Sequence, residues 1–455
     1  MDNRSNFKPA QSLWAILAVL MALLASCSPT LAKRDEYISI YQAGDMAFAE
    51  ERMTKTIENL AADQNFCQSN DAVWLLLDRA TARFAQGNTQ DAIKDYRLAL
   101  EAIDYYNQES TLEHLQQVLL EDGFGAYSGE DFEQILARVY FALALLHEDD
   151  TGNAFALLRQ AEETQQKKRE MYAKTEFTDH YKLIDNAIAK YLLALLLDRK
   201  GDRSNAEILY GQAASLVGSP SFQKDLSAAD QDGKNATVLV ICHNGNSPYK
   251  ISATSNASVA STAALEFILA SRRVDPAWSS LTGIPIPQLV QKSSSFPYPT
   301  FAAIDGIQKS LIPFYDITKT AYQQLQQKLP VIAARAVARF LIRRGTVAYA
   351  KKQDQGMGAL ADLAMFVANA STQADTRSWS TLPSSIDVAR FDLKPGTHLF
   401  SAHVQARAYP PLSGRYQIRV AAGDLCVINI FNIHPGITQV VIPKRFLYID
   451  KGESP

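Results

Sequence analysis

The sequence contains no proline between Leu31 and Gly218, although the whole chain has 18 prolines. Over this stretch apolar residues recur at spacings of three and four, which is the period of one face of an α-helix. Proline removes a backbone donor and clashes with the preceding helical turn, so a long stretch without it is compatible with packed helices. The sequence therefore predicts that residues 35–218 form a helical domain.

Within this stretch the same order of residue types occurs twice: a glycine, then an alanine, a tyrosine and a second alanine at offsets of five, four and three. The two copies are Gly87, Ala92, Tyr96, Ala99 and Gly201, Ala206, Tyr210, Ala213. Glycine tolerates the positive φ of a turn, and alanine lets two helices approach closely. The pattern resembles the tetratricopeptide repeat, in which each unit is a helical hairpin.

Two weaker units accompany these copies. One has its turn at Gly44, and the other places Asp149 or Asp150 where the glycine would stand. The intervals between units are irregular, whereas the tetratricopeptide period is about 34 residues. The prediction is therefore a degenerate, tetratricopeptide-like array with insertions, and the alternative is a generic helical bundle.

Stacked helical hairpins curve and form a groove that binds proteins or peptides. On this interpretation Tyr96 and Tyr210 are weak candidates for contact with a partner. The alternative is that the helices only cover the second half of the chain. The formal net charge of -3 gives no sign of general nucleic-acid binding, and we expect no nucleic-acid partner.

A domain boundary is predicted after the last helix, because Gly218 is followed closely by Pro220 and then by a polar stretch. We assign residues 219–235 to a linker and residues 236–455 to a C-terminal domain. Its first segment, ATVLVIC at 236–242, is rich in β-branched residues and predicts a buried strand.

The C-terminal domain is predicted to be α+β with mainly antiparallel strands. Six prolines between Val274 and Pro313 favour short edge strands over helix. A Lys-Pro-Gly turn at 394–396 lies between two alternating runs, which predicts a β-hairpin. An inserted helical hairpin is expected at about 331–370.

The first helix of that hairpin carries Arg335, Arg339 and Arg343, which are four residues apart and so share one face. One interpretation is a site for an anionic partner or for lipid head groups. The other is a solvated face, or ion pairs with acidic residues of the same domain. We treat these arginines as weak candidates for partner binding.

The most distinctive motif is ADTRSWSTLPSSIDVARFDLKPG, residues 374–396. It contains Asp375, Arg377, Trp379 and Arg390. One interpretation is a binding patch built on a charge and an aromatic anchor. The interpretation we favour is structural: a buried Asp375–Arg377 pair that clamps the connection between helix and strand.

The sequence shows no GxSxG, HExxH, Walker or GxGxxG motif in a suitable context. A histidine, carboxylate and hydroxyl could be assembled from His243, Asp375 and Ser378, but only their nearness to the motifs suggests it. We therefore expect no enzyme, no cofactor and no metal site. Cys242 and Cys426 lie in strand-like runs, where they are either a disulfide or two buried apolar residues.

The N-terminal sequence predicts where in the cell the protein is located. Arg4 and Lys8 precede an apolar run, 12–27, that ends in Leu-Ala-Ser-Cys. This ending resembles a bacterial lipobox, which implies a signal peptide over 1–26, lipid such as palmitate on Cys27 and a tether over 27–34. Serine follows the cysteine, which by the Gram-negative sorting rule implies the outer membrane. An ordinary cleaved signal or an anchor helix is the alternative.

Taken together, these features resemble a family of Gram-negative outer-membrane lipoproteins. The shared features are the helical repeats, the strand at 238–242, the Arg-bearing helix after Leu329-Pro330, and the motif at 374–396. The resemblance implies an envelope role and transfers no catalytic residues. The predicted function is a lipid-anchored periplasmic adaptor that binds another envelope protein. The alternative is a ligand-binding or enzymatic C-terminal domain that uses the helices as a docking or dimerisation arm.

Overall fold

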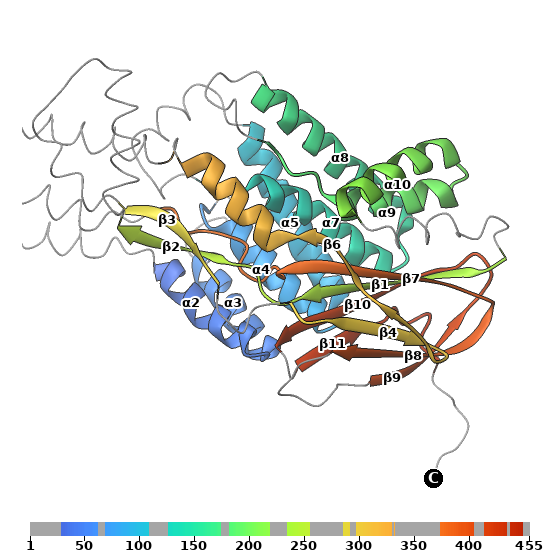
Figure 1. Cartoon of the computed structure of the whole chain (residues 1–455). Coiled ribbons are helices and arrows are strands. Elements are labelled where there is room, and N and C mark those ends of the chain that lie inside the picture. Colours follow the sequence, from blue (N-terminus) through green and yellow to red (C-terminus); the bar gives the residue numbers. More distant parts are fainter. Residues whose placement is uncertain are drawn as a thin grey trace, which may run out of the picture.

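The computed structural model describes residues 29–61, 69–108, 126–173, 182–218, 234–254, 285–291, 297–329, 374–404, 414–434 and 437–448. Helices come first and strands later (Figure 1), so the predicted α-plus-β order is confirmed. The helices are α2 (Pro29–Gln42), α3 (Met46–Ala61), α4 (Ala72–Ala85), α5 (Thr89–Gln108), α7 (Asp131–His147), α8 (Thr151–Ala173), α9 (Ala187–Arg199) and α10 (Arg203–Val217). A further helical segment covers 317–329.

Consecutive helices pack as antiparallel hairpins: α2 with α3, α4 with α5, α7 with α8, and α9 with α10. Each hairpin turns at one residue with positive φ, and these residues are Gly44, Gly87, Asp149 and Gly201. The prediction that an aspartate replaces glycine in the third unit is therefore confirmed at Asp149, whose φ is 67°. Asparagine and aspartate are the non-glycine residues that tolerate this conformation best.

The same hydrogen bonds close each turn. In the second hairpin the amide of Asn88 donates to the carbonyl of Arg83 over 2.9 Å, and in the fourth Asp202 donates to Leu197 over 3.0 Å. The side chain of Asp202 then accepts from the amide of Asn205, which caps α10. A left-handed residue followed by Asp or Asn therefore ends one helix and begins the next.

Replacing Gly87 with alanine should lower the free energy of unfolding by about 1–2 kcal/mol, because an L-residue is strained at the observed φ of 79°. A Cβ at this position meets no atom within 4 Å, so the cost comes from the backbone alone. Gly211 is also unobstructed but lies inside α10. Gly211→Ala should therefore raise stability by about 0.5–1 kcal/mol. Urea unfolding of both variants tests this, and effects of the same sign would contradict it.

The strands are β1 (Ala236–Asn244), β2 (Tyr249–Thr254), β3 (Pro285–Val290), β4 (Thr300–Ile304), β5 (Ile307–Ser310), β6 (Ile312–Asp316), β7 (Ser385–Leu393), β8 (Gly396–Val404), β9 (Gly414–Val420), β10 (Leu425–His434) and β11 (Ile437–Val441). They form a five-stranded sheet in the order β11-β10-β1-β7-β6, a four-stranded sheet in the order β5-β4-β8-β9, and the pair β2-β3. Strands β1 and β10 are parallel, and the other pairings are antiparallel.

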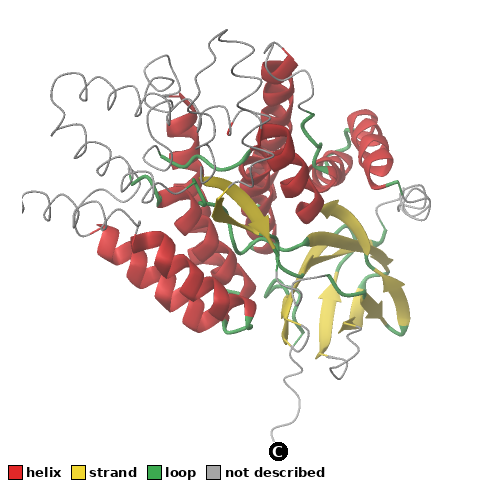
Figure 2. Ribbon diagram, turned by 60° about the vertical axis from the view of Figure 1, so that its left-hand side comes forward, coloured by secondary structure: helices red, strands yellow, loops and turns green. Residues whose placement is uncertain are grey.

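Strand β1 is buried along its whole length because both faces of its sheet are covered. Leu239 and Ile241 belong to the core shared with the helices, whereas Val238 and Val240 belong to the core between the two sheets. Helices α2 and α7 contact β10, and α9 and α10 contact β6. The order of layers is helices, five-stranded sheet and four-stranded sheet (Figure 1), and Figure 2 shows the strands beside the helices. The helices and the five-stranded sheet therefore share one hydrophobic core.

The Lys-Pro-Gly turn at 394–396 does not form the predicted β-hairpin. Strand β7 pairs with β1 and β6, whereas β8 pairs with β4 and β9, so the chain crosses here from one sheet to the other. Strand β1 occupies one edge of β7 along its whole length and β6 pairs with residues 385–388 of the other edge, whereas β8 lies between β4 and β9. The prediction failed because alternation identifies a strand but not its partner.

Several predicted features lie outside the described residues: the signal peptide and Cys27, the helical hairpin at 331–370 except for an isolated helical position at 332, and Arg335, Arg339 and Arg343. Among the helices that are described, none combines the length and apolar character needed to cross a bilayer. Cys242 and Cys426 are free, buried thiols. They lie on neighbouring strands but are out of register, because Cys426 pairs with Val238 and Cys242 pairs with Ile430.

Candidate functional site

The distinctive motif enters the helical half as an extended segment, residues 374–384, which lacks helix and strand. Buried side chains of three helices bind its backbone. Arg34 of α2 donates to the carbonyl of Thr376. Asp78 of α4 accepts from the amide of Thr381 over 2.8 Å, and Glu133 of α7 accepts from the amide of Trp379 over 2.9 Å. The surface that these helices turn toward the second half is thus occupied by the chain itself.

Trp379 anchors this segment. It is 1% exposed, and its ring centroid lies 5.2 Å from that of Tyr140 and 6.3 Å from that of Tyr96. Its indole Nε1 donates to the hydroxyl of Thr81 over 3.0 Å. Tyr96 is fully buried, so the suggestion that it contacts a partner is wrong. Tyr96 instead packs against the chain's own tryptophan.

Asp375 and Arg377 form the predicted ion pair, with 2.8 Å between Oδ2 and Nη2, but only Arg377 is buried, since the Asp375 side chain is 33% exposed. Arg377 also donates through Nη1 to the carbonyl of Asn70 over 3.1 Å. Burial opposes ionisation of Asp375, but the guanidinium outweighs it and holds the pKa of this carboxyl below its usual value. The pair therefore joins the extended segment to the loop before α4.

The structure does not bring His243, Asp375 and Ser378 together as a catalytic set. His243 hydrogen-bonds to the hydroxyl of Tyr140 over 2.8 Å and to Asn429 over 3.2 Å. Burial lowers the pKa of His243 to about 4, which keeps the ring neutral at neutral pH. Asp375 pairs with Arg377, and Ser378 contacts Ser380. These residues serve packing and hydrogen bonding.

Arg390 and Tyr210, two further candidate residues, also make contacts within the protein. Arg390 is 7% exposed on β7, and its Nε donates to Asp392 over 3.1 Å. Tyr210 is half-buried, with its ring centroid 5.7 Å from that of Tyr191 on α9. The ring of Tyr191 also contacts Phe314 of β6 at 5.1 Å. Tyr210 therefore forms part of the contact between the last hairpin and the sheet.

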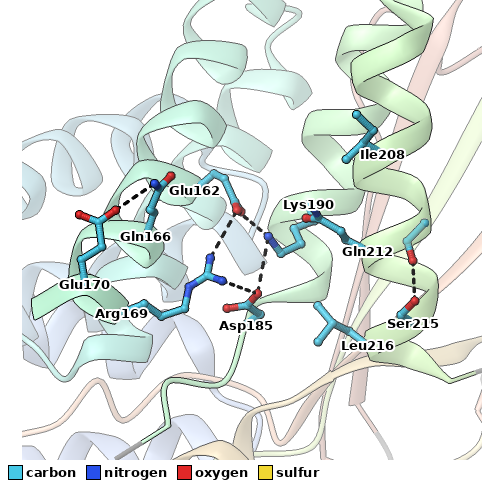
Figure 3. Close-up of a pocket in the computed structure, with 11 residues that line it drawn as sticks. Glu162, Gln166, Arg169, Glu170, Asp185, Lys190, Ile208, Gln212, Ser215 and Leu216 are labelled. Atoms are coloured by element: carbon cyan, nitrogen blue, oxygen red, sulfur yellow. Dashed lines mark hydrogen bonds and ion pairs between the residues drawn. The ribbon is translucent and has the colours of Figure 1, made fainter. Parts of the chain in front are cut away.

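An open groove lies between α8 and α10, at the end of the helical array (Figure 3). Its volume is about 900 Å³. Lys190, at the start of α9, is 2% exposed and lies 2.5 Å from Glu162 and 3.7 Å from Asp185. Arg169 joins the same carboxylates at 3.8 and 3.6 Å. This closed network of two cations and two carboxylates forms the base of the groove.

The α10 wall of this groove is apolar and exposed. Ile208 is 59% exposed and Leu216 is 45% exposed, and Figure 3 shows both side chains directed toward the groove. Gly211 and Gln212 lie between them. On the α8 wall, Glu170 accepts a hydrogen bond from Gln166 over 3.0 Å and pairs with no cation of the described chain.

Sequence reasoning missed this groove, although α10 contained a signal. Ala206, Ala213 and Ala214 are the buried residues of this helix, whereas Ile208 and Leu216 lie on another face. A helix with apolar residues on two faces indicates a second surface to be covered. The signal was weak because single exposed apolar residues are common on protein surfaces.

Within the described part of the chain, no group of histidine, cysteine, aspartate and glutamate side chains is arranged to hold a metal ion. Comparison of the sequence with protein-family models, with curated proteins and with solved structures finds no match.

Proposed function

We propose that this protein is a lipid-anchored adaptor on the periplasmic face of a bacterial outer membrane, where it binds another envelope protein through a degenerate tetratricopeptide-like array. The groove between α8 and α10 carries the proposal, because it exposes Ile208 and Leu216 beside a charged wall. An exposed apolar surface rimmed by polar residues is typical of an interaction site. The lipobox-like sequence that ends at Cys27 supports the proposed location at the outer membrane.

The groove favours an amphipathic helix of the partner as its occupant. Ile208 and Leu216 are two helical turns apart on one face of α10, and such a row accepts the apolar stripe of a second helix. The carboxylate of Glu170 on the opposite wall, which has no cation partner among the described residues, favours a lysine or arginine at the polar edge of that helix. The partner does not bind the surface of α4 and α7 that faces the sheet, because residues 374–384 already occupy that surface.

Replacing both Ile208 and Leu216 with glutamate should reduce recovery of the partner at least tenfold. The test is chemical crosslinking in intact cells, followed by purification of the full-length protein and identification of crosslinked proteins. Both side chains are exposed, so the charges should be tolerated by the fold. Ile307→Glu is the matched control, because Ile307 is 65% exposed on β5, away from the groove. Equal recovery with the groove variant and the control would exclude the groove as the binding site.

The anchor is tested separately. Cys27→Ser should abolish incorporation of radiolabelled palmitate and deplete the protein from the outer-membrane fraction. Acyl chains contribute about 0.8 kcal/mol per buried methylene, so their loss removes the lipid anchor that the proposal requires. Cys242→Ser is the control, because that thiol is buried within β1. Equal labelling of the Cys27 variant and the wild type would disprove lipidation at Cys27 and, with it, the proposed membrane location.

A further inference from the structure

The four-stranded sheet has one face toward the interior and one face toward solvent. Phe400 and Ala402 of β8 point into the core between the sheets. The residues that alternate with them face outward, and cross-strand register places Phe301 opposite His403 and Ala303 opposite Ser401. Ser401 also pairs with Arg415 on β9. Side chains from three strands therefore meet on the outer face.

These outward residues form a hollow of about 410 Å³. The row made by Ala303 and Ser401 is short, whereas the neighbouring row carries the rings of Phe301 and His403, whose centroids are 6.4 Å apart. The difference in side-chain length creates the depression. Arg415 and Gln308 complete its lining.

The hollow is positively charged. Arg415 is exposed and makes no ion pair or side-chain hydrogen bond in the described part of the chain. Arg419 lies further along the same face, with its guanidinium 4.7 Å from the ring centroid of Tyr448. The outward positions of β4, β8 and β9 include no carboxylate. The nearby carboxylate of Asp305, in the β4–β5 turn, accepts hydrogen bonds from the amide of Leu399 and from His398. This surface therefore complements an anion, although the whole chain has a net charge of -3.

We propose that this hollow binds a sugar that carries a carboxylate. The guanidinium of Arg415 pairs with the carboxylate in a forked, charge-assisted contact. The ring of Phe301 covers an apolar C–H face of the sugar, and Ser401, His403 and Gln308 hydrogen-bond to its hydroxyl groups.

A sugar suits this surface better than a peptide. The backbone groups of the central strands β4 and β8 are engaged within the sheet, since each strand has a neighbour on both sides. Only side chains are free to bind a ligand on this face. A peptide would bring its own amide and carbonyl groups, which require partners, whereas a sugar ring presents hydroxyl groups and an apolar face. This site lies on a different layer from the α8–α10 groove and does not depend on the adaptor role.

The test uses the purified full chain, D-glucuronate as the probe, and D-glucose and inorganic phosphate as comparison ligands. Saturation-transfer NMR measures the two sugars directly, and phosphate is measured by its competition with glucuronate, because phosphate has no carbon-bound protons to observe. Glucuronate should bind at least tenfold tighter than either comparison ligand, because only glucuronate has both a negative charge and a sugar ring. Arg415→Gln should weaken glucuronate binding about tenfold, as expected for loss of a charge-assisted hydrogen bond.

Arg419→Gln is the matched control, because it removes the same charge from the same face and strand but does not line the hollow. It should change glucuronate affinity less than twofold. Equal weakening by the two variants would show that glucuronate responds only to the overall positive potential of this sheet face. That result would overturn the proposal. Phosphate binding as tight as glucuronate binding, or no glucuronate binding at all, would also overturn it.

Discussion

Trp379→Ala should lower the free energy of unfolding by about 3–5 kcal/mol, as is usual for truncation of a buried aromatic residue. The side chain is 1% exposed and packs against the rings of Tyr96 and Tyr140. Truncation leaves a cavity at the joint between helices and sheet and removes the donor to Thr81. Since domains are commonly stable by about 5–15 kcal/mol, the loss is a large fraction of the total. Urea unfolding followed by circular dichroism measures it.

Trp379→Phe serves as the control for this effect. It retains most of the buried ring and should cost clearly less than the alanine variant, with the remaining cost arising from the lost indole donor. If alanine costs less than about 1 kcal/mol, the extended segment does not hold the helices to the sheet. In that case the packing of residues 374–384 described above would be wrong.

Asp78→Asn should remove a large part of the pH dependence of stability. Burial raises the pKa of Asp78 from 3.8 to about 7. Hydrogen bonds from Thr381 and Tyr37 favour the ionised form and lower this pKa, but the effect of burial is larger. The folded state therefore holds the Asp78 proton more tightly than the unfolded state does. The contribution of this group to stability falls as pH rises from about 4 to about 7 and is constant above that range. The shift corresponds to at most about 4 kcal/mol.

Asparagine imitates the protonated carboxyl at this position. Its oxygen can still accept from Thr381, and its amide can donate to the hydroxyl of Tyr37 in place of the carboxyl proton. The variant should match the wild type near pH 4 and be more stable near pH 8, as measured by urea unfolding at both pH values. A constant difference between variant and wild type at all pH values would contradict the raised pKa. Asp78→Ala should be destabilising at every pH, because it leaves the amide of Thr381 without its buried acceptor.

The helical hairpins could be predicted because their signals are local. A left-handed residue followed by Asp or Asn ends one helix and caps the next, and this signal was readable even at Asp149, where glycine is absent. The buried strand at 236–242 was equally readable, since covering both faces of a strand demands a continuous apolar run.

The candidate sites could be predicted only in part. The Asp375–Arg377 pair was accessible because its members are two positions apart and oppositely charged. The acceptor for Trp379, by contrast, is Glu133, 246 positions away, and the acceptor for Thr381 is Asp78, 303 positions away. Residue types alone do not indicate which distant carboxylate meets which amide. For the same reason Tyr96 was taken for a candidate partner contact, although it packs against the tryptophan.

The sequence by itself determined the order of helices before strands, the turns of the hairpins and the charged pair of the motif, because periodicity, backbone conformation and short-range charge pairing act over a few residues. Only the tertiary structure decided that β7 and β8 enter different sheets, that residues 374–384 occupy the inner surface of the helices, and that α10 leaves Ile208 and Leu216 exposed. Each of these depends on which surfaces are already covered by distant parts of the chain, and burial of a surface is a property of the whole fold.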